Sequence, residues 1–262
     1  MIDRVAALIR EVSAAVTEPR FTALREGEVE DKSPGELVTV ADREAEAALT
    51  AGLGRITPGV AVVGEEAGAT DPSRLDALRG TDRVWVVDPL DGTGNFVAGS
   101  PEWAVMVALI EGGSAVASWI WQPVTLRMFI AERGSGATAN GAMLRVRDRG
   151  QGGLRGAVLT RFLDPATAAT VDRNIGRIEE VVPGRLCSGY EYPAIIEGEA
   201  DFVLFWRTLP WDHAPGCLLL EEAGGVARRP DGTVYQPGAD GVGLLVASGP
   251  ERWERARAAL FD

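Results

Sequence analysis

The sequence has little histidine, little cysteine and no excess of positive charge, and each shortage excludes a class of protein. Its one histidine, His213, excludes reactions and zinc sites that need two or more histidines. Its two cysteines, Cys187 and Cys217, form no C-x-x-C pair, which favours reduced thiols in a cytoplasmic protein. A formal net charge of −12 argues against nucleic acid or an anionic membrane as a partner, because both select a basic face.

Long apolar runs are also missing. No stretch approaches the roughly 20 residues that cross a bilayer. The opening MIDRVAALIREVSAAV is amphipathic and interrupted by charge, unlike a secretion signal. With 262 residues, 46% hydrophobic and 24% charged, the chain has core material for one large domain or two closely packed subdomains.

Hydrophobic periodicity predicts helices followed by antiparallel strands in the first half. We expect helices over 2–18 and 42–53, a loop or hairpin over 28–42, a strand over 59–66 and a short helix over 73–79. Two apolar runs joined by Glu111-Gly112-Gly113-Ser114 predict a hairpin, and LRMFIAERG and AMLRVR extend its sheet.

The second half alternates strands and helices, which is typical of α/β structure. Strands are predicted over 157–160, 178–182, 201–206 and 242–247, and helices over 165–175, 189–198, 212–224 and 250–261. The shift in composition over 147–156 divides the chain into two subdomains, 1–147 and 148–262.

The stretch VWVVDPLDGTGNF, residues 84–96, ends an apolar strand on two aspartates, Asp88 and Asp91. Turns use Asp, Pro and Gly for geometry alone. Two aspartates directed at one point, however, repel each other unless a positive charge lies between them.

Acidic residues stand at the ends of predicted elements in three further places, at Asp42, Glu65 and Asp212. Taken singly, each has a structural explanation as a helix N-cap or a solvated loop charge. Together they form an all-oxygen set suited to Mg²⁺ or Mn²⁺, and two such ions about 3.5–4 Å apart can clamp a phosphate ester. Gly92, Thr93 and Gly94 would then bring backbone N–H groups close to phosphate oxygens.

Other phosphatase chemistries lack their residues. The sequence contains no D-x-D-x-[TV] nucleophile motif, no C-x₅-R loop around either cysteine and no P-loop.

Five segments resemble, in order and spacing, the signatures of the inositol monophosphatase family. They are VTVADREAEAAL, VVGEEAG, WVVDPLDGTGNF, ERGSGATANG and LPWDHAPGCLLLEEAGG, and the similarity covers nearly the whole chain. The resemblance implies an α-β-α-β-α sandwich of the inositol monophosphatase and fructose-1,6-bisphosphatase type. It also implies a dimeric, lithium-sensitive enzyme that uses two or three Mg²⁺ ions, with Mn²⁺ as an alternative, on a small phosphate ester.

The resemblance also assigns roles to individual residues. Glu65, Asp88 and the carbonyl of Leu90 would hold one ion, Asp88, Asp91 and Asp212 a second, and Glu65 a weaker third. The catalytic set would be Thr93 and Asp42, which orient the attacking water, together with Glu65. The amides of Gly92 and Thr93 would hold the phosphate.

The expected leaving-group pocket departs from the family pattern. Enzymes that hydrolyse inositol phosphate carry a glutamate seven residues before the aspartate of the W-D motif, and this chain has Phe205 there. Phe205 cannot accept a hydrogen bond from a hydroxyl group, whereas Arg207 can bind a second anionic group. Glu191 is a candidate replacement acceptor, in a segment where Tyr190 is also bulkier than usual.

The sequence therefore predicts a Mg²⁺-dependent phosphomonoesterase acting on a substrate such as myo-inositol 1-phosphate. Histidinol phosphate, 3′-phosphoadenosine 5′-phosphate and fructose 1,6-bisphosphate remain alternatives, as does a non-catalytic binding protein of the same fold. His213 is expected at the surface or behind the site. Lys32 is expected as a solvated loop charge, with an approach to the metal ions as the alternative.

Overall fold

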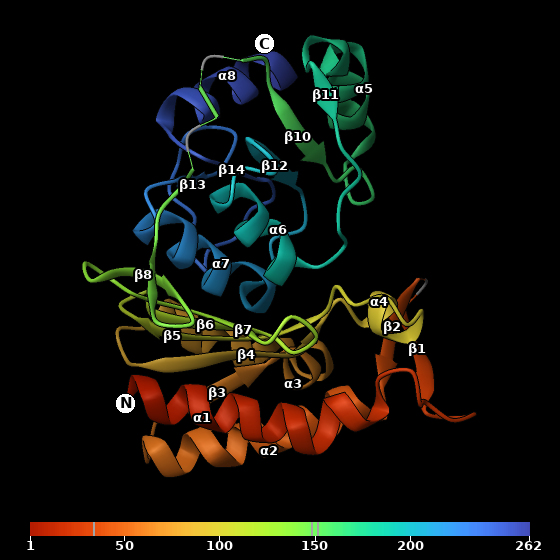
Figure 1. The fold of residues 1–262 in the computed structure, drawn as a ribbon, viewed down its shortest axis with the longest axis vertical. Coiled ribbons are helices and arrows are strands. Elements are labelled where there is room, and N and C mark those ends of the chain that lie inside the picture. The colour runs from red at the N-terminus through yellow and green to blue at the C-terminus, as the bar shows by residue number, and fades with distance from the viewer. Residues whose placement is uncertain (34, 148, 151) are drawn as a thin grey trace.

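The computed structural model describes residues 1–33, 35–147, 149–150 and 152–262. Its elements stack as helix, sheet, helix, sheet and helix layers, from bottom to top in Figure 1. This arrangement confirms the layered α/β sandwich predicted from the sequence.

The first layer holds α1 (Ile2–Val12) and α2 (Val40–Ile56), with a π-helical turn, Ser13–Thr17, continuing α1. Their buried side chains, which include Val5, Ile9, Leu49 and Leu53, pack on one face of the first sheet. Between the two helices, β1 (Val29–Ser33) and β2 (Glu36–Thr39) pair as the predicted hairpin.

The second layer is a seven-stranded sheet in the order β3-β4-β5-β6-β7-β8-β9. Only β3 and β4 pair in parallel; the other neighbours are antiparallel. The strands are β3 (Ala61–Gly64), β4 (Val84–Asp91), β5 (Ala104–Glu111), β6 (Ser114–Gln122), β7 (Arg127–Glu132), β8 (Gly136–Ala139) and β9 (Ala142–Leu144). Short helices follow β3 and β4, namely α3 (Glu65–Thr70), a 3₁₀ segment (Pro72–Arg79) and α4 (Thr93–Val97).

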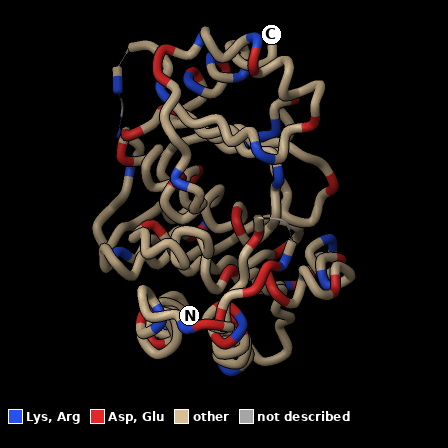
Figure 2. The backbone as a smooth tube through the Cα atoms, turned by 90° about the vertical axis from the view of Figure 1, so that its right-hand side faces the viewer, with Lys and Arg blue, Asp and Glu red and all other residues tan. Residues whose placement is uncertain are grey.

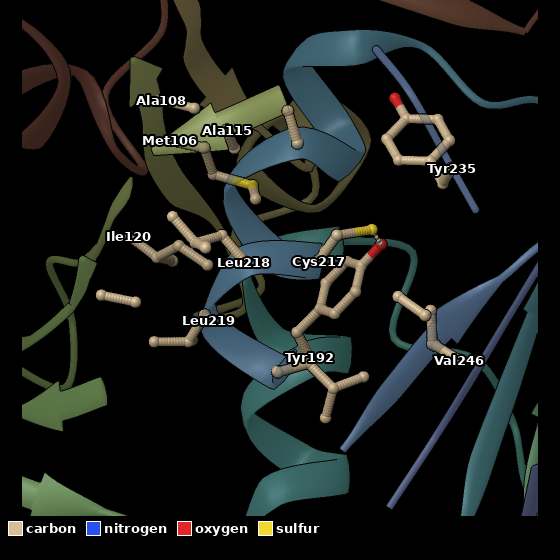
Figure 3. Packing of buried hydrophobic residues seen from close by; sticks show 14 of the residues in the cluster. Met106, Ala108, Ala115, Ile120, Tyr192, Cys217, Leu218, Leu219, Tyr235 and Val246 are labelled. Carbon is tan, nitrogen blue, oxygen red and sulfur yellow. Dashed lines mark hydrogen bonds between the residues drawn. The ribbon is translucent and has the colours of Figure 1, made fainter. Parts of the chain in front are cut away.

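The middle layer consists of α6 (Ser188–Ile196) and α7 (Pro210–Glu222), which lie between the two sheets. Figure 3 shows Tyr192, Leu218 and Leu219 from these helices packed among side chains of the first sheet such as Met106 and Ile120. Because α7 is covered on both sides by sheets, it tolerates the continuous apolar run Leu218-Leu219-Leu220.

The fourth layer is a mixed sheet in the order β11-β10-β12-β14-β13, and α5 (Pro165–Asn174) and α8 (Pro250–Phe261) cover its outer face. The strands are β10 (Arg155–Val158), β11 (Glu180–Val181), β12 (Phe202–Phe205), β13 (Val226–Arg228) and β14 (Leu244–Ala247). Phe202, Leu245 and Trp253 belong to the core between this sheet and the outer helices.

Two details of the sequence-based assignment were wrong. The strand predicted over 59–66 ends at Gly64, so Glu65 and Glu66 open a helix instead. The helix predicted over 2–18 changes to π-helical geometry after Val12. The division at residues 147 and 148 stays a prediction, and Asp148 and Gln151 of the predicted boundary lie outside the described residues.

Basic and acidic residues are interspersed along the chain (Figure 2). Among the described residues, no helix combines the length and the apolar character needed to cross a membrane.

Candidate active site

The candidate site begins where β4 ends. All eight residues of β4 are buried, and Asp88 is only 1% exposed. The pairing of β4 with β5 is interrupted between Asp88 and Asp91, where Pro89 has no backbone N–H to donate. At this interruption both carboxylates line one cavity, and Asp88 Oδ1 accepts a hydrogen bond from the Leu90 nitrogen at 3.0 Å.

The turn after β4 requires a glycine at position 92. Gly92 has φ +84°, and a Cβ there would lie 3.0 Å from the Glu102 carbonyl oxygen and 3.1 Å from Cys187 Cβ. The sharp turn leads directly into α4, whose first residue is Thr93. The Thr93 hydroxyl lies 3.0 Å from both Asp42 Oδ1 and the Leu90 carbonyl oxygen, so it can donate its proton to either acceptor.

Asp42 is held in place by the start of α2. Thr39 caps this helix, and Asp42 Oδ2 accepts hydrogen bonds from the Thr39 nitrogen at 2.8 Å and from the Thr39 hydroxyl. Burial raises the pKa of Asp42 to about 6, although the hydrogen bonds from Thr39 oppose the shift. At neutral pH Asp42 is therefore mainly ionised and able to accept the proton of Thr93.

Glu65 stands at the first position of α3, directly after the parallel strand β3. Lys32 on the β1–β2 hairpin donates to Glu65 at 3.0 Å and to Glu66 at 2.6 Å. Burial and repulsion from Asp212 raise the pKa of Glu65 to about 8, and the positive charge of Lys32 limits the rise.

Asp212 lies in the first turn of α7, two residues after Pro210. Proline is tolerated there because the first N–H groups of a helix have no intrahelical acceptor. Burial and the charge of Asp91 raise the pKa of Asp212 to about 7, while the charge of Arg207 opposes the shift. Burial also raises the pKa values of Asp88 and Asp91, and the charge of Glu65 adds to the shift at Asp88.

This donor set fits divalent cations. The carboxylates of Glu65, Asp88, Asp91 and Asp212, of which Asp88 and Asp91 are buried, repel one another, and Lys32 supplies a positive charge beside Glu65. Among the described residues, no three or more Asp, Glu, His and Cys side chains already form a closed metal-ligand group. Glu65 is instead bonded to Lys32, and Asp91 Oδ2 accepts from the Gly189 nitrogen at 2.6 Å and from the Cys187 thiol at 2.9 Å.

The cavity has a volume of about 580 Å³, and besides the acids its lining includes the aromatic side chains of Phe162 and Phe205 and the basic side chains of Lys32, Arg161 and Arg207. Phe205 and Arg207 both line it, as predicted. Arg207 pairs with Glu36 on the hairpin, and its guanidinium carbon lies 4.2 Å from the centre of the Phe162 ring. Phe205 stacks on Tyr192, with ring centres 5.6 Å apart.

Glu191, in contrast, does not line this cavity in the described part of the chain. Its side chain is buried and accepts a hydrogen bond from the Arg185 nitrogen, and burial raises its pKa to about 7. Tyr190, also predicted near the leaving group, donates instead to the Pro101 carbonyl at 3.0 Å. Both side chains are hydrogen-bonded to backbone groups elsewhere, and the structure does not bring either of them to the cavity wall.

Three residues beside the acids, Lys32, His213 and Cys187, make hydrogen bonds that were not predicted from the sequence. Lys32 is bonded to two glutamates and is not a solvated charge. His213 is buried behind the site, which was one of the two places expected for it. It is hydrogen-bonded to the Arg207 carbonyl and to the Tyr192 hydroxyl at 3.0 Å each, and its pKa falls to about 4 because burial disfavours its charged form. Cys187 contacts Asp91. Lys32 and Cys187 carried no local sequence signal for these contacts, because their partners lie 33 or more positions away in the sequence.

Buried acids around a hydroxyl–carboxylate pair are typical of enzymes that hydrolyse phosphate esters with divalent cations. A sequence profile of the Inositol monophosphatase family matches residues 2–261, and the chain belongs to this family. Members of this family are phosphatases and are generally metal-dependent, so the chain is a phosphoric monoester hydrolase.

Individual relatives agree on the family but differ in their names. The chain is 33% identical over 242 residues to an inositol-1-monophosphatase of Mesorhizobium japonicum, covering 84% of each sequence. It is also 33% identical over 242 residues to the histidinol-phosphatase of Mycobacterium tuberculosis, covering 88% of this chain and 89% of that one. An inositol monophosphatase structure from Zymomonas mobilis superposes with a TM-score of 0.80 at 25% identity, over 98% of this chain and 96% of that one.

Proposed function

We propose that the protein is a Mg²⁺-dependent phosphomonoesterase that hydrolyses a small metabolite phosphate such as myo-inositol 1-phosphate. The observation that carries this proposal is the convergence of Glu65, Asp88, Asp91 and Asp212 on one cavity beside the Thr93–Asp42 hydrogen bond.

The acidic residues divide into two overlapping ligand sets. Glu65, Asp88 and the Leu90 carbonyl would hold one Mg²⁺ ion, and Asp88, Asp91 and Asp212 a second. Glu65 would also reach a weaker third ion, and Mn²⁺ can replace Mg²⁺ because both prefer oxygen ligands. When bound, these cations polarise the phosphate and lower the pKa of an attacking water.

The chain's own residues would orient the nucleophile and hold the phosphate. Thr93 donates its hydroxyl proton toward Asp42, which leaves its oxygen lone pairs free to accept a hydrogen bond from water. The Gly92 turn exposes backbone N–H groups, its own and that of Thr93, to a phosphate beside the acids. Water would attack phosphorus directly, without a phosphoenzyme.

Substrate preference would be decided at Phe205 and Arg207. Phe205 offers no acceptor for ring hydroxyls, so discrimination in favour of inositol phosphate should be weak. Arg207 would attract a second anionic group, although its pairing with Glu36 partly neutralises it. Histidinol phosphate, 3′-phosphoadenosine 5′-phosphate and fructose 1,6-bisphosphate therefore belong in the substrate panel. A histidinol-phosphatase among the relatives supports including the first.

The remaining elements of the proposal concern organisation. We propose a homodimer of chains that each have two subdomains, 1–147 with most of the acids and 148–262 with Asp212 and the leaving-group pocket. Lithium should inhibit by competing at the cation sites. Two free buried thiols, Cys187 and Cys217, agree with a cytoplasmic location.

The test is phosphate release from the four esters with Mg²⁺ and with chelator. The proposal expects Mg²⁺-dependent release from at least one ester, with kcat/KM values for the panel lying close together. A protein that binds Mg²⁺ but releases no phosphate from any ester would instead be a non-catalytic binding protein of this fold.

A further inference from the structure

Two buried acids lie one helical turn apart on α2, and only one belongs to the site described above. Asp42 contacts Thr93. The other, Glu46, is 8% exposed and accepts hydrogen bonds from the backbone nitrogens of Glu66 at 2.7 Å and Ala67 at 2.9 Å. Both carboxylate oxygens of Glu46 are therefore bonded to the first turn of α3, the helix that opens with Glu65.

The contact between Glu46 and α3 requires a glycine at position 64. A Cβ atom at Gly64 would lie 2.3 Å from Glu46 Cδ and 2.3 Å from Glu46 Oε2, so any other residue would displace the carboxylate. A Cβ at Gly68, within α3, would lie 2.9 Å from the ring of Trp211, the residue before Asp212. The helix that begins with Glu65 is therefore in close contact both with Glu46 of α2 and with Trp211 of α7.

The contacts that hold α3 in place oppose the electrostatic repulsion between the acids of the site. Asp212 and Asp88 repel the carboxylate of Glu65, which favours movement of α3 away from the cavity. The first N–H groups of a helix have no intrahelical partner, and an anion placed there is favoured by the helix dipole. Glu46 supplies that carboxylate from α2, a helix of 17 residues, and its two hydrogen bonds to the first turn of α3 act against the repulsion.

We propose that Glu46 is a positioning residue that holds Glu65 at the distance from Asp88 and Asp212 that divalent cations require. This inference rests on the proposed function of the cavity as a cation-dependent site. Partners that orient metal ligands typically change metal affinity by about 10- to 100-fold when they are removed. The expected signature is therefore weaker Mg²⁺ binding, with substrate affinity unaffected.

Two variants disturb the contact from its two sides. Glu46→Gln keeps the size of the side chain but turns an amide N–H₂ toward a backbone N–H, so that one of the two hydrogen bonds is lost. Gly64→Ala keeps Glu46 and displaces its carboxylate. The matched control is Glu44→Gln, on the exposed face of the same helix, where Glu44 pairs with Arg20.

Mg²⁺ is titrated at constant ionic strength into each folded protein, and the melting temperature is followed. The half-saturating Mg²⁺ concentration is also measured from phosphate release, with kcat and KM at saturating Mg²⁺. We expect Glu46→Gln and Gly64→Ala to raise the half-saturating concentration about 10- to 100-fold, whereas Glu44→Gln changes it less than about twofold. Excess Mg²⁺ should restore most of kcat, and KM should stay within about threefold.

The possible results separate the inference from the proposed function. If both site variants melt at lower temperature without metal but keep the wild-type Mg²⁺ response, Glu46 is only structural and the inference is overturned. If Glu46→Gln does not fold, Gly64→Ala decides on the same criterion. A wild-type protein whose melting temperature and phosphate release both ignore Mg²⁺ would instead overturn the proposed function.

Discussion

The carboxylates of the candidate site should make the metal-free protein less stable as the pH rises. Glu65 has a pKa of about 8 in the folded protein and an ordinary value of 4.5 when the chain is unfolded. The folded state therefore binds more protons at neutral pH, and the free energy of unfolding must fall as Glu65 ionises. His213 acts in the opposite direction, because its pKa is lowered to about 4, but only below about pH 6.5.

The window from pH 7 to pH 8.5 therefore avoids the titration of His213. The thiols of Cys187 and Cys217 add a smaller loss of stability in the same direction, because burial raises their pKa and they begin to ionise only in the unfolded chain. Over this range the ionisation of a group with the pKa of Glu65 lowers the free energy of unfolding by about 1.3 kcal/mol through proton linkage. The Glu65 side chain is 22% exposed, so solvent screening makes this figure an upper limit. For a protein of this size the corresponding fall in melting temperature is about 3–5 °C.

The assay is urea unfolding in chelator at pH 7 and pH 8.5, repeated with Mg²⁺. Glu65→Gln should lose much less stability than the wild type between the two pH values, because its side chain cannot ionise. Glu11→Gln, an exposed change of the same charge on α1, should behave as the wild type does. Saturating Mg²⁺ should abolish the loss, because bound carboxylates are already ionised. A metal-free wild type that is equally stable or more stable at pH 8.5 would refute the reasoning.

Three substitutions should separate the roles of the cavity residues. Asp88→Asn should lower kcat for steady-state phosphate release by at least about 10³-fold, because both proposed cation sites lose a ligand, while the circular dichroism spectrum stays native. Near-normal turnover would exclude a bridging role for Asp88. Thr93→Val should lower kcat about 10²-fold or more, because the group that orients the attacking water is lost, while KM stays within about threefold of the wild-type value. An effect on KM alone would mean that Thr93 acts only in substrate binding. Phe205→Glu should raise kcat/KM for myo-inositol 1-phosphate relative to the other esters. It should also lower the melting temperature, because a ring that is 5% exposed and stacked on Tyr192 is replaced by a charge. Unchanged selectivity would place the hydroxyl acceptor elsewhere.

The layered fold was predictable because its long elements carry unambiguous patterns. The all-apolar start of β4 and the amphipathic face of α1 each allow one interpretation, and the hairpin of β5 and β6 is marked by Gly112 and Gly113. The short helices α3 and α4 were missed because five or six residues carry too little periodicity. Their formation depends on tertiary contacts, such as the hydrogen bonds from Glu66 and Ala67 to Glu46.

The acids of the site were found by their motifs, whereas the residues that support them were not. Asp88 and Asp91 stand out because a buried strand ends on two carboxylates. Lys32 contacts Glu65 and Cys187 contacts Asp91, which lie 33 and 96 positions away in the sequence, and nothing in the local sequence marks either contact. Glu191 was a candidate acceptor for substrate because a carboxylate can accept hydrogen bonds from hydroxyl groups. Its carboxylate instead accepts a hydrogen bond from the Arg185 nitrogen inside the protein.

The most direct test of the central claim is a single Mg²⁺ titration of the chelator-treated protein, read in parallel by melting temperature and by phosphate release from its best ester. If the buried acids form the catalytic cation site, both signals should rise from the metal-free baseline, and Asp88→Asn should lose the phosphate release and weaken the thermal response. Phosphate release that persists in chelator, or that remains in Asp88→Asn at the wild-type rate, would contradict the account.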